Sequence, residues 1–209
     1  SPTGSGKTLA YVLPILNKVD GSKKQIQALI VAPSQELAMQ IVEVIREWTV
    51  GTNITVQQLI GGANSARQIE KLKKKPTIVV GTPGRLNELA RGGKLKLKDV
   101  ETIVLDECDQ LLSREYRVVV KSFIDSAAWG RQIVVVSATI TEEIELVAER
   151  LMHEPVRIKI KPEDMVKFGK VVHSFIKVEE RDKTDFLRRL SNIEGLRGLA
   201  FVNNIDQVL

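Results

Sequence analysis

The chain has 209 residues, of which 43% are hydrophobic and 27% charged, a composition typical of a folded globular protein rather than a disordered one. No apolar run approaches the roughly 20 residues that a membrane-spanning helix needs, and the first residues lack a signal-peptide pattern. The net charge of +5 mildly favours an anionic partner. The single cysteine, Cys108, excludes an internal disulfide and favours a reducing, cytoplasmic setting.

The chain opens with a glycine-rich segment, SPTGSGKT, that leads into an apolar helical pattern. It matches the end of a phosphate-binding loop, although Ser1 stands where the strict pattern has its first glycine. Backbone N–H groups and the positive end of a helix dipole attract phosphate at such a turn. We expect Lys7 to reach the β- and γ-phosphates of a nucleotide and the Thr8 hydroxyl to hold Mg²⁺. The predicted nucleotide-binding residues are Thr3, Gly4, Ser5, Gly6, Lys7 and Thr8.

The same segment has a simpler interpretation, a flexible Gly-Ser-Gly linker followed by a solvated helix start. Pro14 lies inside the helical pattern and is expected to kink the helix.

Short apolar runs then alternate with helical patterns. Several runs are nearly continuous in valine, isoleucine and leucine, as expected for strands buried on both faces of a parallel sheet. This alternation predicts an α/β fold with a mostly parallel, doubly wound sheet. The predicted strands span 28–32, 54–60, 77–80, 102–105, 133–136 and 156–160, and the predicted helices span 35–48, 66–74, 114–127 and 142–152.

A polar segment at 161–170, with a proline and a glycine, breaks the alternation and is interpreted as a linker. The first domain then spans 1–160. The remaining residues, 171–209, are too few for a core of their own and are interpreted as the beginning of a second α/β domain. In this part the patterns predict strands at 173–178 and 198–202 and a helix at 182–190.

The strand candidate at 102–105 runs directly into Asp106-Glu107-Cys108-Asp109. A buried parallel strand delivers such carboxylates to the carboxyl edge of the sheet, where α/β proteins bind ligands. Asp106 is therefore a candidate for holding Mg²⁺, and Glu107 for polarising an attacking water. A single acidic cluster is often only a solvated helix start. The glycine-rich loop before it and the segment 137–139, Ser-Ala-Thr, after it favour the catalytic interpretation.

Together these motifs resemble those of the DEAD-box family of superfamily 2 RNA helicases, in the family's order. The segment 1–8 resembles motif I, 106–109 motif II, 137–139 motif III and 199–203 the strand of motif IV. The resemblance implies a RecA-like P-loop domain and the start of a second RecA-like domain, with ATP and Mg²⁺ as cofactors. Cys108 replaces the alanine usual in motif II, and Gln35 replaces an arginine.

The resemblance also implies a path for the sugar-phosphate backbone of RNA, bound without reading its sequence. Glycine exposes N–H groups, serine and threonine offer hydroxyls, and Arg85 pairs with phosphate. Without the family pattern, 61–62 and 82–84 would be interpreted as plain turns. The predicted RNA-binding residues are Pro33, Ser34, Gln35, Gly61, Gly62, Thr82, Gly84 and Arg85, and those predicted to couple the nucleotide site to domain closure are Asp109, Ser137 and Thr139.

The function implied by the resemblance is that of an ATP-dependent RNA helicase, an ATP hydrolase with Lys7, Asp106 and Glu107 as catalytic residues. Alternatives are a DNA-directed translocase of the same superfamily, which more often has histidine at the position of Asp109, and a nucleotide-gated RNA-binding protein with little turnover. The strand leading into the phosphate loop and the arginine supplied by the second domain are not found in this sequence. We therefore expect the 209-residue chain by itself to be marginally folded and inactive.

Overall fold

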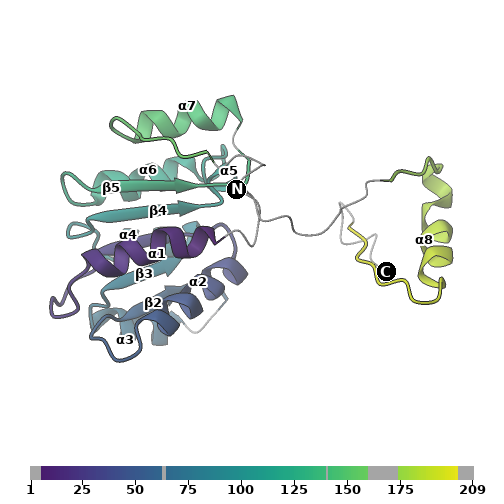
Figure 1. The fold of residues 1–209 in the computed structure, drawn as a ribbon. Helices are drawn as coiled ribbons and strands as arrows, with labels where there is room; N and C mark the ends of the chain where they lie inside the picture. The colour runs from purple at the N-terminus through teal and green to yellow at the C-terminus, as the bar shows by residue number, and fades with distance from the viewer. Residues whose placement is uncertain (1–5, 63–64, 140, 160–173, 202–209) are drawn as a thin grey trace. The chain divides into compact units, whose positions relative to one another are not determined.

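The computed structural model describes residues 6–62, 65–139, 141–159 and 174–201, and the chain divides into two compact units, Ser1–Met165 and Val166–Leu209. In the described part of the first unit, five strands form one sheet in the order β2-β3-β1-β4-β5 (Figure 1). All four strand pairings are parallel, which confirms the predicted sheet. The strands are β1 Ala28–Val31, β2 Val56–Leu59, β3 Ile78–Gly81, β4 Thr102–Asp106 and β5 Gln132–Val136.

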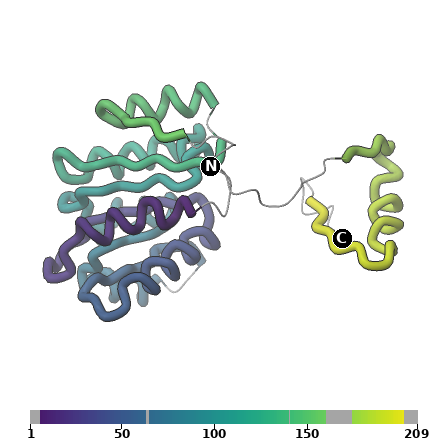
Figure 2. The backbone as a smooth tube through the Cα atoms, in the orientation of Figure 1, coloured from purple at the N-terminus to yellow at the C-terminus, as the bar shows by residue number. Residues whose placement is uncertain are grey.

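Helices cover both faces of this sheet. On one face α1 and α2 pack, and they lie side by side in Figure 2; the other face is covered by α3 to α7. Successive side chains of β1 point to opposite faces of the sheet, since Leu29 belongs to one core cluster and Ile30 to the other. The helices are α1 Lys7–Lys18, α2 Gln35–Trp48, α3 Ser65–Lys73, α4 Pro83–Arg91, α5 Cys108–Leu111, α6 Arg117–Ser126 and α7 Glu142–Leu151.

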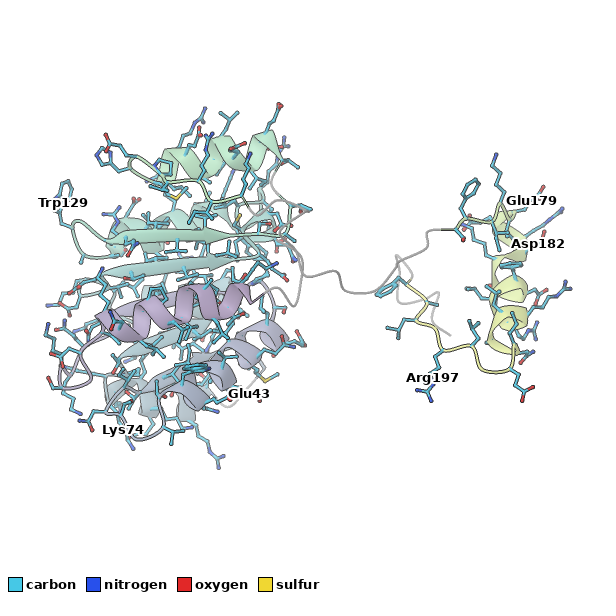
Figure 3. The ribbon with its side chains drawn as sticks, viewed as in Figure 1. Glu43, Lys74, Trp129, Glu179, Asp182 and Arg197 are labelled. Atoms are coloured by element: carbon cyan, nitrogen blue, oxygen red, sulfur yellow. The ribbon has the colours of Figure 1, made fainter. Side chains whose placement is uncertain are left out.

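Burial is greatest in the middle of the sheet. Every residue of β1, β3 and β4 is buried, whereas β5 pairs with β4 alone and its side chains are only partly buried. The loop that enters β5 lies at the amino ends of the strands and carries Trp129, whose side chain projects outward with 98% exposure (Figure 3). The bulky exposed aromatic group thus lies at the edge of the sheet opposite to the predicted site.

Gly81, the last residue of β3, allows the chain to pass very close to its neighbours. A Cβ atom at this position would lie 2.4 Å from the Leu59 carbonyl oxygen of β2 and 2.9 Å from Leu86 Cδ2 of α4. Only glycine avoids both clashes without a shift of the backbone. The close approach brings the start of α4 over the carboxyl ends of β2 and β3.

The observed helices differ from the sequence-based expectations in several places. The segment 82–84 is not a plain turn, because Pro83 occupies the first helical position of α4, where its missing N–H has no intrahelical partner to lose. The sequence did not predict α4, whose first turn combines a proline with Gly84. The predicted helix 114–127 is shorter, at Arg117–Ser126, while α1 continues through Pro14 on its exposed side.

The predicted strand at 156–160 is wrong for the residues described, 156–159. Its alternating apolar residues, Val156 and Ile158, are 89% and 87% exposed. Arg157 instead forms ion pairs with two glutamates of α7, Glu145 (3.4 Å) and Glu149. An alternating pattern makes a strand only when a neighbouring strand edge and a buried face are available.

In the second unit, the predicted helix is confirmed as α8 (Lys183–Ser191), preceded by a 3₁₀ turn at Glu180–Asp182. The strands predicted at 173–178 and 198–202 are absent from their described parts, 174–178 and 198–201, where Phe175 and Phe201 are 86% and 92% exposed. The predicted linker 161–170 lies outside the described residues. Within the described segments, no helix combines the length and apolarity needed to cross a bilayer.

Candidate functional site

The predicted site residues gather at one edge of the sheet. Because all five strands are parallel, their carboxyl ends share this edge. After β1 the chain crosses to β2 and β3, which lie on one side of β1, and after β4 it crosses to β5 on the other side. The direction in which strands are added therefore reverses between the adjacent strands β1 and β4. Ligands of open α/β sheets bind at such a switch point. The residues at or just after the strand ends are Ser34 (β1), Gly61 (β2), Thr82 (β3), Asp106 (β4) and Ser137 (β5).

Asp106 is a buried carboxylate at the end of β4, only 3% exposed. Its Oδ1 accepts a hydrogen bond from the Glu107 N–H (2.9 Å), and its Oδ2 accepts one from the Tyr11 hydroxyl of α1 (2.8 Å). Burial, and then the nearby Asp106 carboxylate, raise the pKa of Tyr11, so that its hydroxyl stays protonated and donates. This contact brings the first turn of α1, with Lys7 and Thr8, beside a residue far along the chain.

The start of α1 has the backbone expected of a phosphate-binding turn. Gly6 is the N-cap and has φ 80°, a left-handed conformation that favours glycine. No acidic residue lies in the first turn of this 12-residue helix, so its positive dipole end is not offset by a neighbouring carboxylate on the same turn. Lys7 and Thr8 are half-buried there. The predicted residues Thr3, Gly4 and Ser5 lie outside the described part of the chain.

Glu107 adopts an unusual backbone between β4 and α5. Its φ of 51° and ψ of 54° are left-handed, a conformation that non-glycine residues rarely adopt and that costs about 1 kcal/mol or more. Its Oε2 accepts a hydrogen bond from Gln110 Nε2 (2.9 Å). Strain of this kind persists where the surrounding structure enforces it, and it gathers at functional sites.

Cys108 and Asp109 follow directly. Cys108 is fully buried, and burial, followed by the charge of Asp109, raises the pKa of its thiol to about 12, so the thiol stays protonated near neutral pH. Asp109 Oδ1 lies 2.6 Å from Ser137 Oγ, and the Thr139 N–H donates to the same hydroxyl oxygen (3.2 Å). Ser137 Oγ is also 2.6 Å from the Thr139 carbonyl oxygen. Its single proton serves one acceptor at a time, and the charged carboxylate is the stronger.

Seven of the eight predicted RNA-binding residues line one open cavity of about 510 Å³, the proposed RNA groove; Gly62 does not. They reach it from the carboxyl ends of β1, β2 and β3, on the far side of β1 from Asp106. Four further residues, which the sequence did not single out, complete the lining. The lining residues are Pro33, Ser34, Gln35, Glu36, Gly61, Thr82, Pro83, Gly84, Arg85, Glu88 and Tyr116.

Individual groups in the groove differ in how they are held. The Ser34 hydroxyl oxygen caps α2 by accepting the Leu37 N–H (3.2 Å), which leaves its proton to donate. Thr82 is the N-cap of α4 but makes no such side-chain bond. Gln35 is exposed, and its Nε2 would lie 3.5 Å from a Cβ atom at Gly61.

Arg85 is buried rather than displayed to solvent. Its guanidinium donates to Glu88 Oε1 (2.6 Å), to Ser65 Oγ (2.7 Å) and to Gln68 Oε1 (3.4 Å), while Gln68 Nε2 donates to the Ile60 carbonyl (2.9 Å). These contacts tie the start of α3 to α4 and use three of the five guanidinium N–H donors. Arg85 therefore has an internal structural role beside the predicted contact with phosphate.

Tyr11 is a further residue at this edge that the sequence motifs did not indicate. It lies three positions after Thr8, a spacing that places the two side chains on the same side of a helix. From this spacing alone, the sequence could have predicted that Tyr11 lies close to Thr8. The bond to Asp106 had no sequence signal, because it depends on how α1 packs against β4.

The sequence is similar to a known family and to curated proteins. Residues 1–147 match the sequence model of the DEAD/DEAH box helicase family. The chain is 47% identical over 208 residues to "Probable ATP-dependent RNA helicase YfmL" of Bacillus subtilis, covering 100% of this chain and 55% of that protein. It is 43% identical over 204 residues to "DEAD-box ATP-dependent RNA helicase CshC" of Bacillus cereus, covering 98% and 52%. The chain thus spans about half the length of these curated relatives.

Solved structures give the same picture. A DEAD box protein from the hyperthermophile Methanococcus jannaschii superposes with a TM-score of 0.73 at 31% identity, covering 98% of this chain and 54% of that one. The yeast DEAD-box splicing factor Prp28 superposes with a TM-score of 0.67 at 32% identity, covering 74% and 39%.

Proposed function

Because this chain belongs to the DEAD/DEAH box helicase family, we propose that the full-length protein is an ATP-dependent RNA helicase that acts in the cytoplasm, separating short RNA duplexes or remodelling RNA–protein complexes. The single observation that carries the proposal is the buried carboxylate of Asp106, bonded to α1 and followed by Glu107, at the same sheet edge as the RNA groove. This arrangement supports a nucleotide site and a nucleic-acid site on one rigid sheet.

The residues at this edge suit ATP and Mg²⁺. Protein sites for Mg²⁺ usually supply one or two oxygen ligands and leave the rest to water and substrate phosphates. Asp106 and Thr8 match that donor set, and the described residues contain no cluster of three or more His, Cys, Asp or Glu side chains that would form a protein-only cage. When bound, Mg²⁺ would neutralise charge on the phosphate oxygens. Lys7 and the N–H groups at the start of α1 would hold the phosphates.

Glu107 is the proposed base. The left-handed backbone turns the chain directly after Asp106, so that two adjacent carboxylates serve different tasks. Asp106 is buried and accepts hydrogen bonds from two donors, whereas Glu107 is half-buried and accepts one from Gln110. Glu107 would orient the attacking water and accept its proton as the terminal phosphate departs.

Asp109, Ser137 and Thr139 would transmit the state of the nucleotide site. Asp109 is the second residue of α5, and its carboxylate accepts a hydrogen bond from the hydroxyl of Ser137, in the segment that follows β5. A change in position at Asp106 or Glu107 would reach this segment through α5. Such a linkage between a nucleotide site and a mobile neighbouring domain is a common means of switching.

In the RNA groove, backbone N–H groups at Gly61 and Gly84 and the hydroxyls of Ser34 and Thr82 would bind sugar and phosphate oxygens. Contacts of this type position a strand without selecting its sequence. Among the residues lining the groove, Tyr116 is the single aromatic side chain, which argues against a series of stacked bases.

Phosphate release by the full-length protein tests the proposal. ATP hydrolysis should be slow alone and should rise several-fold with saturating single-stranded RNA, but not with DNA of the same sequence. Stimulation by DNA alone would favour the translocase alternative. Tight, ATP-dependent RNA binding without turnover would favour the nucleotide-gated binding protein. Either result would contradict the helicase assignment.

Changing Gln35 to arginine should tighten RNA binding by the full-length protein. Gln35 is exposed on the wall of the groove opposite Gly61, and a guanidinium there would add one charge near the RNA backbone. The dependence of log K on log salt should steepen by up to about one phosphate contact, to a similar extent for unrelated RNA sequences. Titrations at several salt concentrations measure this slope.

Gln40→Arg is the matched control, because it adds the same charge to an exposed position of the same helix, outside the groove lining. An equal change in both variants would mean that only net charge matters. An unchanged slope for Gln35→Arg would place Gln35 off the RNA path.

A further inference from the structure

The Tyr11 hydroxyl contacts Asp106, one of the two residues proposed to hold Mg²⁺. It donates to Asp106 Oδ2 at 2.8 Å in a buried contact. One hydroxyl therefore connects α1 with the end of β4. The side chain itself is only 3% exposed.

The direction of this bond follows from counting protons. A tyrosine hydroxyl has one proton, and an ionised carboxylate can only accept. Tyr11 is therefore the donor and Asp106 Oδ2 the acceptor.

This direction determines which atoms remain for a metal ion. On Asp106, Oδ2 has one donor from Tyr11 and Oδ1 has one from Glu107, which restricts the rotation of the carboxylate while each oxygen retains acceptor capacity. The Asp106 carboxylate is thus held before any cation arrives.

We propose that Tyr11 is a positioning residue for Mg²⁺, whose hydroxyl holds the Asp106 carboxylate in the orientation that receives the metal ion. This inference rests on the proposed function, since it concerns the metal of the ATP site. It adds a residue that the motif pattern does not include.

Packing alone does not require the hydroxyl. The Tyr11 ring belongs to the core cluster formed by α1, α2 and the sheet, where a phenylalanine ring would fill the same space. A buried hydroxyl lowers stability unless it is hydrogen-bonded. Its hydrogen-bond partner here is Asp106, which lies at the edge that would receive a nucleotide.

The test is the Mg²⁺ dependence of nucleotide binding by the full-length protein, measured without hydrolysis. A fluorescent ADP, N-methylanthraniloyl-ADP, is titrated in EDTA and at a series of Mg²⁺ concentrations. Tyr11→Phe should raise the half-saturating Mg²⁺ concentration by about three- to tenfold, the scale of one net hydrogen bond. Affinity in EDTA should stay within about twofold, because the phosphate-binding groups are unchanged.

Ile15→Val is the matched control. Ile15 is 4% exposed on the same helix and in the same core cluster, and loss of one methyl group weakens the packing without touching a polar group. Its Mg²⁺ dependence should equal that of the unmodified protein. An equal shift in both variants, or no shift in Tyr11→Phe, overturns the role of Tyr11. Nucleotide binding that is independent of Mg²⁺ in the unmodified protein overturns the proposed metal site itself.

Two non-natural side chains at position 11 keep the test decisive if Tyr11→Phe does not fold. 4-Methylphenylalanine has nearly the volume of tyrosine and no donor, so it should reproduce the raised Mg²⁺ requirement. 4-Aminophenylalanine retains a donor for Asp106 and should restore a requirement close to that of the unmodified protein. Identical behaviour of these two variants would overturn the proposal.

Discussion

Replacing Glu107 with glutamine should lower RNA-stimulated ATP hydrolysis by the full-length protein about 10²–10⁴-fold, the typical loss when a general base is removed. The amide retains the size of the side chain and an oxygen that accepts the Gln110 donor, so the turn after β4 should survive. Binding of ATP should persist, because Glu107 is proposed to contact water rather than phosphate. Single-turnover phosphate release and fluorescent-nucleotide titration measure the two properties separately.

Glu101→Gln is the corresponding control at the other end of the same strand. Glu101 is exposed and immediately precedes β4, so the substitution is chemically identical but lies at the amino edge of the sheet. Its rate should equal that of the unmodified protein. Hydrolysis by Glu107→Gln at the unmodified rate would show that another group activates the water.

Replacing Gly81 with alanine should destabilise the protein by about 1–3 kcal/mol, the usual range for overpacking a core, because the new methyl group meets backbone. The Leu59 carbonyl oxygen at 2.4 Å belongs to a neighbouring strand and cannot rotate away as a side chain end would. Relief requires β2 to move or α4 to lift from the sheet. Urea denaturation monitored by circular dichroism measures this loss of stability as a lower midpoint concentration.

Gly84→Ala is the control for adding a methyl group nearby. A Cβ atom at Gly84 meets nothing within 4 Å, and this residue lies in the first turn of α4. Alanine there should leave stability unchanged or raise it by up to about 1 kcal/mol. Equal midpoints for the two variants would refute the argument from close approach.

The order of motifs and the strand pattern determined much of this protein from sequence alone. The nearly continuous apolar runs at 28–32, 77–80 and 102–105 indicate strands without knowledge of their neighbours, because a strand buried on both faces requires apolar side chains in both directions. Once these strands are parallel, Ser34, Thr82 and Asp106 must share one edge. The fold class and the position of the candidate site follow from this local information.

Tertiary structure alone decided which apolar segments became strands. Both 132–136, a nearly continuous apolar run, and 156–159, an apolar–charged alternation, have patterns typical of strands, but the first lies beside β4 and the second lies beside α7, where Arg157 pairs with glutamates. A strand is stabilised by its neighbour, and a sequence pattern does not carry the neighbour's identity.

The fine structure of the site was decided in the same way. The guanidinium of Arg85 is a group that commonly binds phosphate, yet packing between α3 and α4 directs its N–H donors to Ser65, Gln68 and Glu88. Tyr11 lies on the apolar face of α1 like an ordinary core residue, yet the packing of α1 against β4 lets its hydroxyl donate a hydrogen bond to Asp106. The chemistry of a side chain is set by its sequence, whereas the partners of its polar atoms are set by contacts between segments far apart in the chain.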